Sequence, residues 1–460
     1  MNMPEVDLTQ LPALEGHVAG THPLSARSAA SGLSGLTRSV VGYAPDSLWE
    51  IETARLPSAL QALRRKARAF AERTLAPRAL EVDALAHWPV GATPAPLASL
   101  LEEAGRAGWL TDMLPWPLGS APLGEYRHPL VLRACLKVEE FSRVCGGQML
   151  LLCAHTLGIA PILLTGNPNT IRRFVLPAFR ALQRGEPHLF AFAITEPGAG
   201  SDVEDGMGAA QLQPGVVASR VDGGWQLNGR KCFISGGDLA QSLTVFAALE
   251  GEGMASWTCF LVNRDMPGFR PVRTELKMGM RASGAAELEF DQVFVPDSHV
   301  LGGLRKGWSL NRETLNLSRT PVAAMAVGFA QAATDIAADF ACRTQLGGKA
   351  LVHYQDVQLT LAQMMAETSA IRALVWQSAK TWAPRQGTAS MAKFHATDVA
   401  MRVIALAQDL LGNHALLHAN RLEKVYRDCR LTQIFEGTNQ INRLSVVEDF
   451  QETLLARAAG

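Results

Sequence analysis

A single glutamate in an apolar run is the residue best suited to acid–base chemistry. Glu436 follows the run 431–435 (Leu-Thr-Gln-Ile-Phe) and precedes Gly437, Thr438 and Asn439. A glycine directly after such a run predicts the end of a helix, with the carboxylate pointing out of it. Beside an apolar ligand, the carboxylate would be a stronger base than in water. The same pattern also fits a helix cap with a solvated glutamate.

A second candidate segment spans residues 192–202 and reads Phe-Ala-Ile-Thr-Glu-Pro-Gly-Ala-Gly-Ser-Asp. It begins like a strand and breaks at Pro197. Its two glycines would let backbone amides approach a phosphate or the polar edge of a ring. Thr195 and Ser201 add hydroxyl groups. Short glycine motifs are weakly specific, so an ordinary turn after a strand is the alternative.

A third segment, residues 227–237, reads Leu-Asn-Gly-Arg-Lys-Cys-Phe-Ile-Ser-Gly-Gly. Asn228-Gly229 between strand-like runs predicts a hairpin turn. The following strand brings an aromatic ring, Phe233, next to a hydroxyl group, Ser235. Together they could cover a flat ring and bond to it, although a hairpin strand with a core phenylalanine fits equally.

The pattern of apolar residues predicts four regions that position these segments. Residues 1–50 are rich in Ser, Gly, Ala and Pro and predict a flexible N-terminal arm. Residues 51–190 have helical periodicity and predict an N-terminal helical domain. Short apolar runs between turn residues predict a central β domain over 191–304. Long helical patterns return over 305–460. We therefore expect an α+β fold that is mostly helical.

Composition limits the classes of partner. The 43 Lys and Arg balance the 43 Asp and Glu, which gives no electrostatic reason to expect nucleic acid. Seven scattered cysteines lack metal-ligand spacing, so we expect free thiols, a reducing compartment and no metal site. The longest apolar run, 148–164, is interrupted by polar, Gly and Pro residues, so no membrane span is expected. We expect a cytoplasmic protein, with a mitochondrial transit peptide around 25–39 left open.

Taken together, the three segments resemble the acyl-CoA dehydrogenase family. The resemblance covers about residues 54–450 and includes the runs 276–283, 287–296 and 313–319 and the pair Arg427-Asp428. Several long motifs occur in the same order and at the same spacing, so the resemblance is too extensive to arise by chance. The resemblance implies an N-terminal helical domain, a central β-barrel-like domain and a C-terminal four-helix bundle. It also implies a homodimer or homotetramer.

The resemblance further implies a reaction. Glu436 would abstract the α-proton of an acyl thioester, and N5 of FAD would accept the β-hydride. The thioester carbonyl would be held by the Glu436 amide and a ribityl hydroxyl of FAD. Some branches of the family place the base one residue before the position of Arg319, but Ser318 stands there. The implied substrate is an acyl-CoA or an acyl carrier protein thioester, and the implied acceptor is an electron-transferring flavoprotein.

Two sets of binding residues follow from the resemblance. The FAD contacts would come from Phe192, Ile194, Thr195, Phe233, Ile234, Ser235, Arg343, Gln345, Gln355, Asp409, Gly412, Thr438 and Gln440. The substrate contacts would come from Ser201, Asn316, Arg319 and Gly437.

The chain departs from the family most on the adenosine side of FAD. The usual Arg-x-x-Phe-Gly has a leucine in place of the phenylalanine, at Leu346. The usual Gln-Ile-x-Gly-Gly-x-Gly loop, which in the family reaches a neighbouring subunit's FAD, is replaced over 409–415 by Asp-Leu-Leu-Gly-Asn-His-Ala.

Two rival functions stay open at this point. The first is a flavin oxidase or monooxygenase on the same fold. The second is a degenerate, non-enzymatic member that binds an acyl group or a partner, which the altered 409–415 loop would favour. The colour of the purified protein separates the second rival from the two enzymes.

Overall fold

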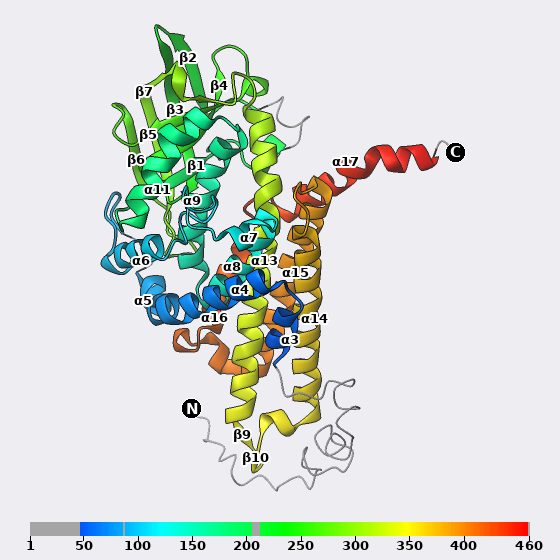
Figure 1. The fold of residues 1–460 in the computed structure, drawn as a ribbon. Coiled ribbons are helices and arrows are strands. Elements are labelled where there is room, and N and C mark those ends of the chain that lie inside the picture. The colour runs from blue at the N-terminus through cyan, green and yellow to red at the C-terminus, as the bar shows by residue number, and fades with distance from the viewer. Residues whose placement is uncertain (1–46, 86–87, 205–211, 459–460) are drawn as a thin grey trace, which may run out of the picture.

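The computed structural model describes residues 47–85, 88–204 and 212–458, in the order helices, sheet, helices. Figure 1 shows the sheet at one end of a long helical bundle, with the first helices packed along its side. The predicted α+β fold, mostly helical, is confirmed. The exact domain boundaries stay a prediction. Residues 1–46 of the predicted arm lie outside the described residues, and helix α3 already begins at Leu48.

The first helical part contains α3 (Leu48–Ala54), α4 (Ser58–Phe70), α5 (Ala79–Ala84), α6 (Ala95–Arg106), α7 (Leu123–Tyr126), α8 (Leu130–Val144), α9 (Gly146–Leu164), α10 (Pro168–Thr170) and α11 (Leu176–Gln183). Its helices are amphipathic, as in α4, where Leu60, Leu63, Ala67 and Phe70 are buried on one face. Glu139 of α8 is buried between Arg64 of α4 and Arg372 of the bundle, at 2.8 Å from each. This ion-paired group ties the first helices to the bundle.

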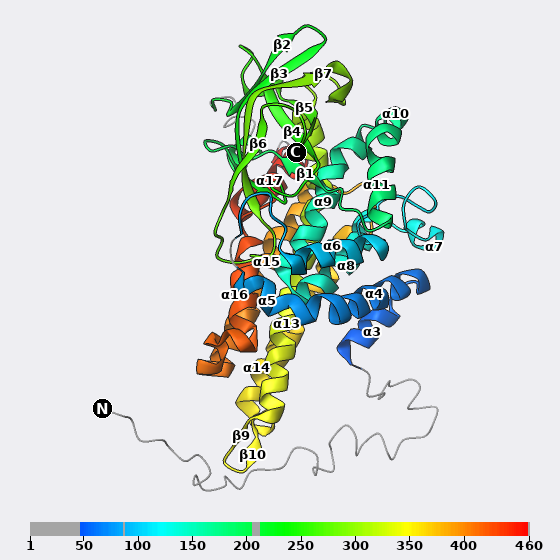
Figure 2. The same ribbon diagram turned by 90° about the vertical axis from the view of Figure 1, so that its left-hand side faces the viewer.

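The sheet contains β1 (Phe190–Ala193), β2 (Val216–Val221), β3 (Gly224–Ser235), β4 (Ser242–Leu249), β5 (Thr258–Asn263), β6 (Phe269–Thr274), β7 (Ala285–Pro296) and β8 (Val300–Leu301). Its strand order is β6-β7-β3-β2-β4-β5-β8, with β1 parallel to β4. In Figure 2 the sheet curves around the end of the molecule, and α9 and α11 lie beside it.

The predicted hairpin turn at Asn228-Gly229 is wrong. Strand β3 runs straight through this pair, and the hairpin with β2 closes at Asp222-Gly223 instead, where Val221 pairs with Gly224. The register of β3 against β7 shifts at Gly229, which has a φ of 130°. A Cβ there would lie 2.0 Å from the carbonyl oxygen of Gly215. The Asn-Gly pair therefore forms a bulge inside a strand rather than a turn.

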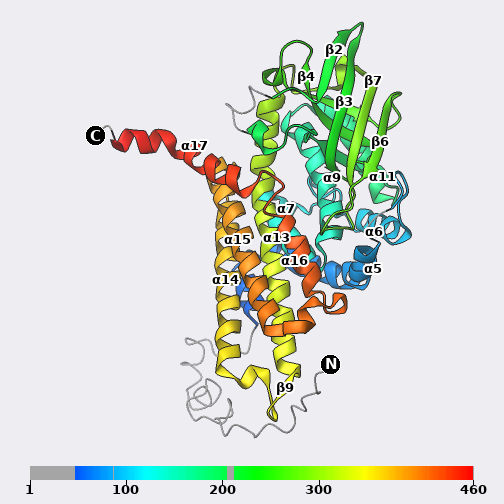
Figure 3. The ribbon, with the colours of Figure 1, turned by 180° about the vertical axis from the view of Figure 1, so that it is seen from behind.

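The bundle contains α13 (Gly307–Arg343), α14 (Gln355–Ala379), α15 (Gln386–Leu411), α16 (Leu422–Leu431) and α17 (Asn439–Ala458). The short strands β9 (Gln345–Leu346) and β10 (Lys349–Ala350) join α13 to α14 at the end farthest from the sheet. Figure 3 shows α13, α14 and α15 side by side, with α17 extending away from them. Helix α13 runs from the sheet to the far end of the bundle, so it connects the two halves of the molecule.

Two helices, α9 and α13, are long and apolar enough to cross a membrane by length and composition alone. Helix α9 continues through His155, Gly158 and Pro161, so these residues interrupt the apolar run without ending the helix. However, 72% of the most apolar window is buried inside the fold in both helices. Buried core helices show the same length and composition, so these two properties of α9 and α13 are weak evidence for a membrane span.

Helix α9 and strand β1 touch directly, and this contact fixes the start of the second candidate segment. A Cβ at Gly158 would lie 2.7 Å from the Ala191 nitrogen, so the helix can approach the strand only with glycine there. His155 Nδ1 accepts a hydrogen bond from Phe190 N at 3.1 Å. Its other ring nitrogen, Nε2, therefore carries the proton and donates to Leu110 O at 2.9 Å.

The buried His155 makes the fold sensitive to acid. Burial lowers the pKa of His155 to about 3, from 6.5 in an exposed histidine. The unfolded chain therefore binds more protons than the folded chain between these values, and stability falls as the pH drops below 6.5. Glutamine keeps a donor and an acceptor but does not titrate. Over that pH window we therefore expect the free energy of unfolding to fall by about 1.4 kcal/mol less per pH unit in His155→Gln than in the wild type. Urea unfolding from pH 7 to pH 4 measures this difference, and parallel curves for the two proteins would contradict the expectation.

Candidate active site

A cavity of about 490 Å³ lies where the sheet meets α8, α9, α13 and the loop after α16. It collects residues from all three candidate segments. The predicted site residues that line it are Phe192, Ile194, Thr195, Ser201, Phe233, Ile234, Ser235, Glu436, Gly437 and Thr438. Residues far apart in the sequence thus form one site.

Glu436 occupies a tight turn between α16 and α17. Its φ is 56° and that of Gly437 is 79°, so both residues are left-handed. A left-handed conformation in a residue other than glycine costs about 1–3 kcal/mol and is concentrated at functional sites. The expected helix break is confirmed, because α16 ends at Leu431 and α17 begins at Asn439.

Buried polar groups hold this turn in place. Lys393 of α15 donates to Gly437 O at 2.6 Å and to Asn439 Oδ1 at 2.9 Å. Asn442 Nδ2 also donates to Gly437 O, at 2.9 Å. Thr438 N donates to Ser201 Oγ at 3.0 Å, which joins the turn to the second segment. Sequence reasoning missed Lys393 and Asn442, since nothing in their local sequence points to a contact with this turn.

Sequence reasoning considered Ser318 of α13 only as an unsuitable base and missed its contact with Glu436. Its hydroxyl donates to Glu436 Oε2 at 2.6 Å. Ser318 cannot itself act as a base, but its hydroxyl orients the Glu436 carboxylate, which can.

The second segment is anchored by a buried ion pair. Lys231 Nζ donates to Glu196 Oε1 at 2.7 Å and to Ile194 O at 2.8 Å, and both side chains are almost fully buried. Glu196 also accepts from Gly215 N at 2.6 Å. Cys232 N donates to Thr195 O at 3.0 Å. These bonds fix the backbone on both sides of Thr195.

The cavity fits a flat ring with a polar edge. Among the described residues, the hydroxyl groups of Thr195 and Ser235 have no hydrogen-bond partner in the protein, and both line the cavity. Phe233 has a φ of 56° and is 61% exposed, which leaves its ring free to cover a ligand. An aromatic face beside two free hydroxyl groups suits the flavin ring of FAD.

Five of the predicted FAD contacts lie elsewhere: Arg343, Gln345, Gln355, Asp409 and Gly412. They gather at the far end of the bundle, where α13 ends and α14 begins (Figures 1 and 3). The 409–415 loop lies at the same end, since the rings of His414 and Phe340 are 5.2 Å apart. Ser318 and Arg343 are separated along α13 by about 37 Å, at 1.5 Å per residue. These five residues therefore do not reach the cavity of their own chain.

The remaining predicted contacts lie near the cavity but not on its wall. Asn316 is buried on α13, and its Oδ1 has no hydrogen-bond partner among the described residues. Arg319 is buried and donates to Ser390 Oγ at 3.1 Å. Gln440 is exposed in the first turn of α17. Their ligand contacts stay predictions.

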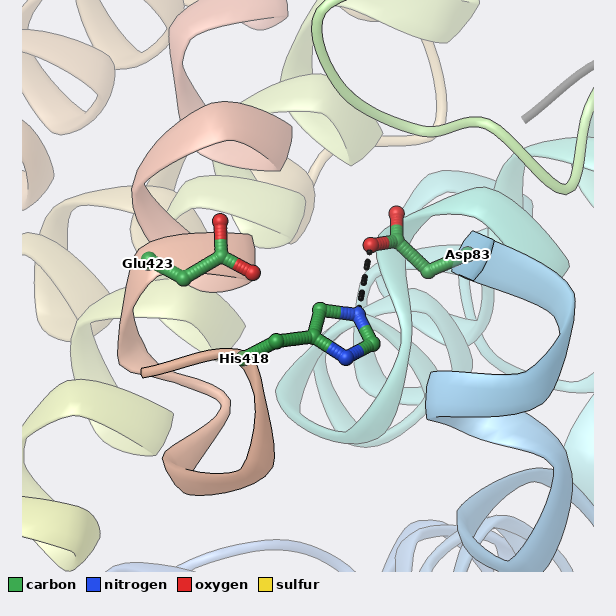
Figure 4. Close-up of side chains that lie close together, drawn as sticks. All are labelled: Asp83, His418 and Glu423. Atoms are coloured by element: carbon green, nitrogen blue, oxygen red, sulfur yellow. Dashed lines mark hydrogen bonds and ion pairs between the residues drawn. The ribbon is translucent and has the colours of Figure 1, made fainter. Parts of the chain in front are cut away.

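A separate polar cluster joins α5 to the region of α16. The ligand atoms of Asp83, His418 and Glu423 lie within 4.8 Å of one another (Figure 4). Arg427 donates to Asp83 Oδ2 and to Glu423 Oε2, both at 2.6 Å, and so occupies the carboxylates that a cation would need. Burial alone would raise the pKa of Asp83, but Arg427 and Lys424 hold it below its usual value. The cluster is therefore a group of ion pairs that joins α5 to the α16 region.

The fold and the cavity are those of a flavin enzyme that acts on an acyl chain, and comparisons with known proteins agree. Family models described as the N-terminal, middle and C-terminal domains of acyl-CoA dehydrogenase match residues 57–181, 191–293 and 305–450. The chain belongs to the acyl-CoA dehydrogenase family. It is an FAD-dependent oxidoreductase that introduces an α,β double bond into an acyl-CoA.

Individual relatives cover most of the chain. Cyclohex-1-ene-1-carbonyl-CoA dehydrogenase of Geobacter metallireducens is 35% identical, over 82% of this chain and 94% of its own length. The caffeyl-CoA reductase–Etf complex subunit CarC of Acetobacterium woodii is 29% identical, over 84% of this chain and 96% of its own. A solved acyl-CoA dehydrogenase from Bacillus anthracis, complexed with FAD, is 26% identical with a TM-score of 0.76, over 88% of this chain and 69% of its own.

Proposed function

We propose that Glu436 is the base that removes the α-proton of the acyl-CoA. The observation that carries this proposal is the placement of Glu436 in a strained, left-handed turn on the wall of the cavity, with Ser318 bonded to its carboxylate. A fixed carboxylate needs little reorganisation when it receives a proton, which favours general-base catalysis. By its position in the family's motif, the Glu436 amide donates to the thioester carbonyl and stabilises the negative charge that develops there.

The same proposal assigns the opposite wall to the cofactor. Thr195 and Ser235 would bond the polar edge of the flavin ring, and Phe233 would cover its face. When bound, FAD supplies the oxidant that takes up the β-hydride. Phe192 and Ile194 would contribute backbone to the ring's edge, and Thr438 would bond the cofactor from the Glu436 side. Ser201 and Gly437 would contact the acyl-CoA where it enters.

We further propose that a second copy of the chain completes each FAD site. The cluster of Arg343, Gln345, Gln355, Asp409 and Gly412 lies at the far end of α13, too far for a cofactor in this chain's cavity to reach. In a homodimer or homotetramer these residues would meet the adenosine end of the partner's FAD. Gln440, Asn316 and Arg319 are assigned to the rim of the site on the same basis.

The electron acceptor and the location are also proposals. An electron-transferring flavoprotein is the proposed acceptor, since one relative is a subunit of an Etf complex. We propose the cytoplasm as the location, because the chain's cysteines are free thiols and several of its relatives are bacterial proteins. The acyl carrier is proposed to be coenzyme A rather than an acyl carrier protein.

An anaerobic titration tests the proposed function. The purified protein should be yellow, and one class of acyl-CoA should bleach its visible flavin absorbance, because two electrons pass to the flavin. The same titration with acyl carrier protein thioesters should give little bleaching. A yellow protein that no thioester bleaches would overturn the assignment. A colourless protein that cannot be reconstituted with FAD would favour the non-enzymatic alternative.

A further inference from the structure

The wall of the cavity away from Glu436 contains a buried charge. Helix α8 presents Leu130, Val131, Ala134, Lys137 and Val138 to the cavity, one stripe at helical spacing. Four of these residues are apolar and suit an acyl chain. Lys137 interrupts them although it is only 5% exposed.

The position of Lys137 places it beside the acyl tail rather than the reacting carbons. Along α13 the cavity wall runs from Thr314 to Met325, and Ser318, which bonds Glu436, lies about 10 Å from Met325 along the helix axis. Helix α8 packs there, since Ser142 Oγ donates to Met325 O at 3.1 Å. We assign Lys137 to the part of the cavity that receives the tail, because its neighbours on this wall are apolar.

A partner from another segment holds Lys137. Its ammonium group donates to Asp112 Oδ1 at 2.9 Å and to Asp112 Oδ2 at 2.7 Å. Met113, the next residue, also lines the cavity, as does Cys153 of α9. Burial raises the pKa of the Cys153 thiol to about 11, and Lys137 and Asp112 lie close enough to contribute.

This pair leaves one hydrogen-bond donor for a ligand. An ammonium group has three N–H donors, and the carboxylate of Asp112 engages two of them. A hydrocarbon tail next to Lys137 would exclude water from the third donor without replacing its hydrogen bond, which is costly for a charged group. A tail that carries an oxygen acceptor would satisfy it.

The local charges favour a neutral oxygen over a carboxylate. Asp112 already pairs with Lys137, and Arg133, which donates to Asp112 O at 3.2 Å, lies near the carboxylates of both Asp112 and Glu125. A second carboxylate beside this balanced pair would bring an uncompensated negative charge into an apolar cavity. We propose that Lys137 is a specificity-determining residue that selects acyl-CoA substrates whose tail carries a neutral oxygen, as a hydroxyl or phenol. This inference rests on the proposed function and names the substrate class of the same cavity.

The test compares matched acyl-CoA pairs. Straight-chain acyl-CoAs, their ω-hydroxy and ω-carboxy counterparts, and 3-phenylpropanoyl-CoA with its 4-hydroxy form are assayed for kcat/KM. We expect the best hydroxylated member to exceed its hydrocarbon partner by about 10- to 100-fold, the usual effect of an unpaired buried donor. Lys137→Met, which keeps the unbranched shape of the side chain without its ammonium group, should reduce this ratio to about one or below. Lys380→Met, at an exposed lysine that ends α14 and is off the cavity wall, should leave it unchanged.

A binding measurement separates selection from turnover. In a Glu436→Gln background, calorimetric Kd values for the same pairs should show the same preference, and Lys137→Met should remove it. If Lys137→Met folds poorly, the double variant Lys137→Met with Asp112→Asn removes both charges of the pair. It should show the same loss of preference for the hydroxylated acyl-CoA.

The outcomes distinguish this inference from the proposed function. Bleaching of the flavin with equal kcat/KM for both members of each pair would overturn the role of Lys137 alone. A preference for the ω-carboxy member would overturn the proposal that the tail carries a neutral oxygen. A preference for the hydroxylated member that survives in Lys137→Met would assign selection to another residue. If no acyl-CoA bleaches the flavin, the proposed function itself fails.

Discussion

Replacing Glu436 by glutamine is expected to lower the rate of flavin bleaching by acyl-CoA about 10²- to 10⁴-fold, and further if no other base substitutes. The amide keeps the size of the side chain but cannot accept the α-proton. Because Gly437 O and Thr438 N are held by Lys393 and Ser201, the turn itself should persist. FAD content and the circular dichroism spectrum should therefore stay at wild-type values. Rapid-mixing absorbance measurements of the first turnover give the rate directly.

A matched variant shows that the loss is specific to the site. Glu313→Gln removes a carboxylate that is exposed on α13, the helix that also carries Ser318, and is expected to turn over like the wild type. Wild-type bleaching by the Glu436→Gln protein would disprove the assignment of the base. Equal loss in both variants would point to a general effect of charge rather than to proton abstraction.

The largest expected effect on stability belongs to the buried pair of Lys231 and Glu196. Burial lowers the pKa of Lys231, and Glu196 opposes this shift. Lys231→Met would leave the Glu196 carboxylate buried without its cation and would remove the bond to Ile194 O. We expect a loss of about 3–5 kcal/mol in the free energy of unfolding, as for other buried pairs that lose one partner. FAD content should fall as well, because Thr195 directly follows Ile194. Guanidinium unfolding and absorbance measure the two effects.

A double variant tests whether the effect comes from the charge. Lys231→Met with Glu196→Gln removes both charges, and the Gln oxygen can still accept from Gly215 N, although its amide nitrogen cannot accept from Val216 N as Glu196 Oε1 does. Most of the lost stability should return in this variant. Arg220→Ala breaks an exposed pair with Asp297 on the same sheet and should change stability little. A loss for Lys231→Met no greater than that for Arg220→Ala would contradict the anchoring role of the pair.

Much of the architecture could be predicted from local sequence. The apolar spacing of Leu60, Leu63, Ala67 and Phe70 predicts the buried face of α4, because a helix repeats every 3.6 residues whatever it packs against. The helix break between Leu431 and Asn439 was predictable for a similar local reason. The turn at Asn228-Gly229 was not, since a glycine at positive φ serves a bulge as well as a turn. Only the pairing of β3 with β7 distinguishes the two.

The sequence by itself determined the order of helices, strands and helices, and the three segments whose motifs resemble the family. Those signals are local, so they survive without coordinates. Only the tertiary structure decided which residues meet. Ser318 and Glu436 are bonded across 118 positions of the chain, and Lys137 finds Asp112 across 25. Burial and distance create such contacts after the helices pack, and neither quantity is encoded in the neighbouring residues. The same reason explains why the predicted FAD contacts fall into two groups at opposite ends of α13.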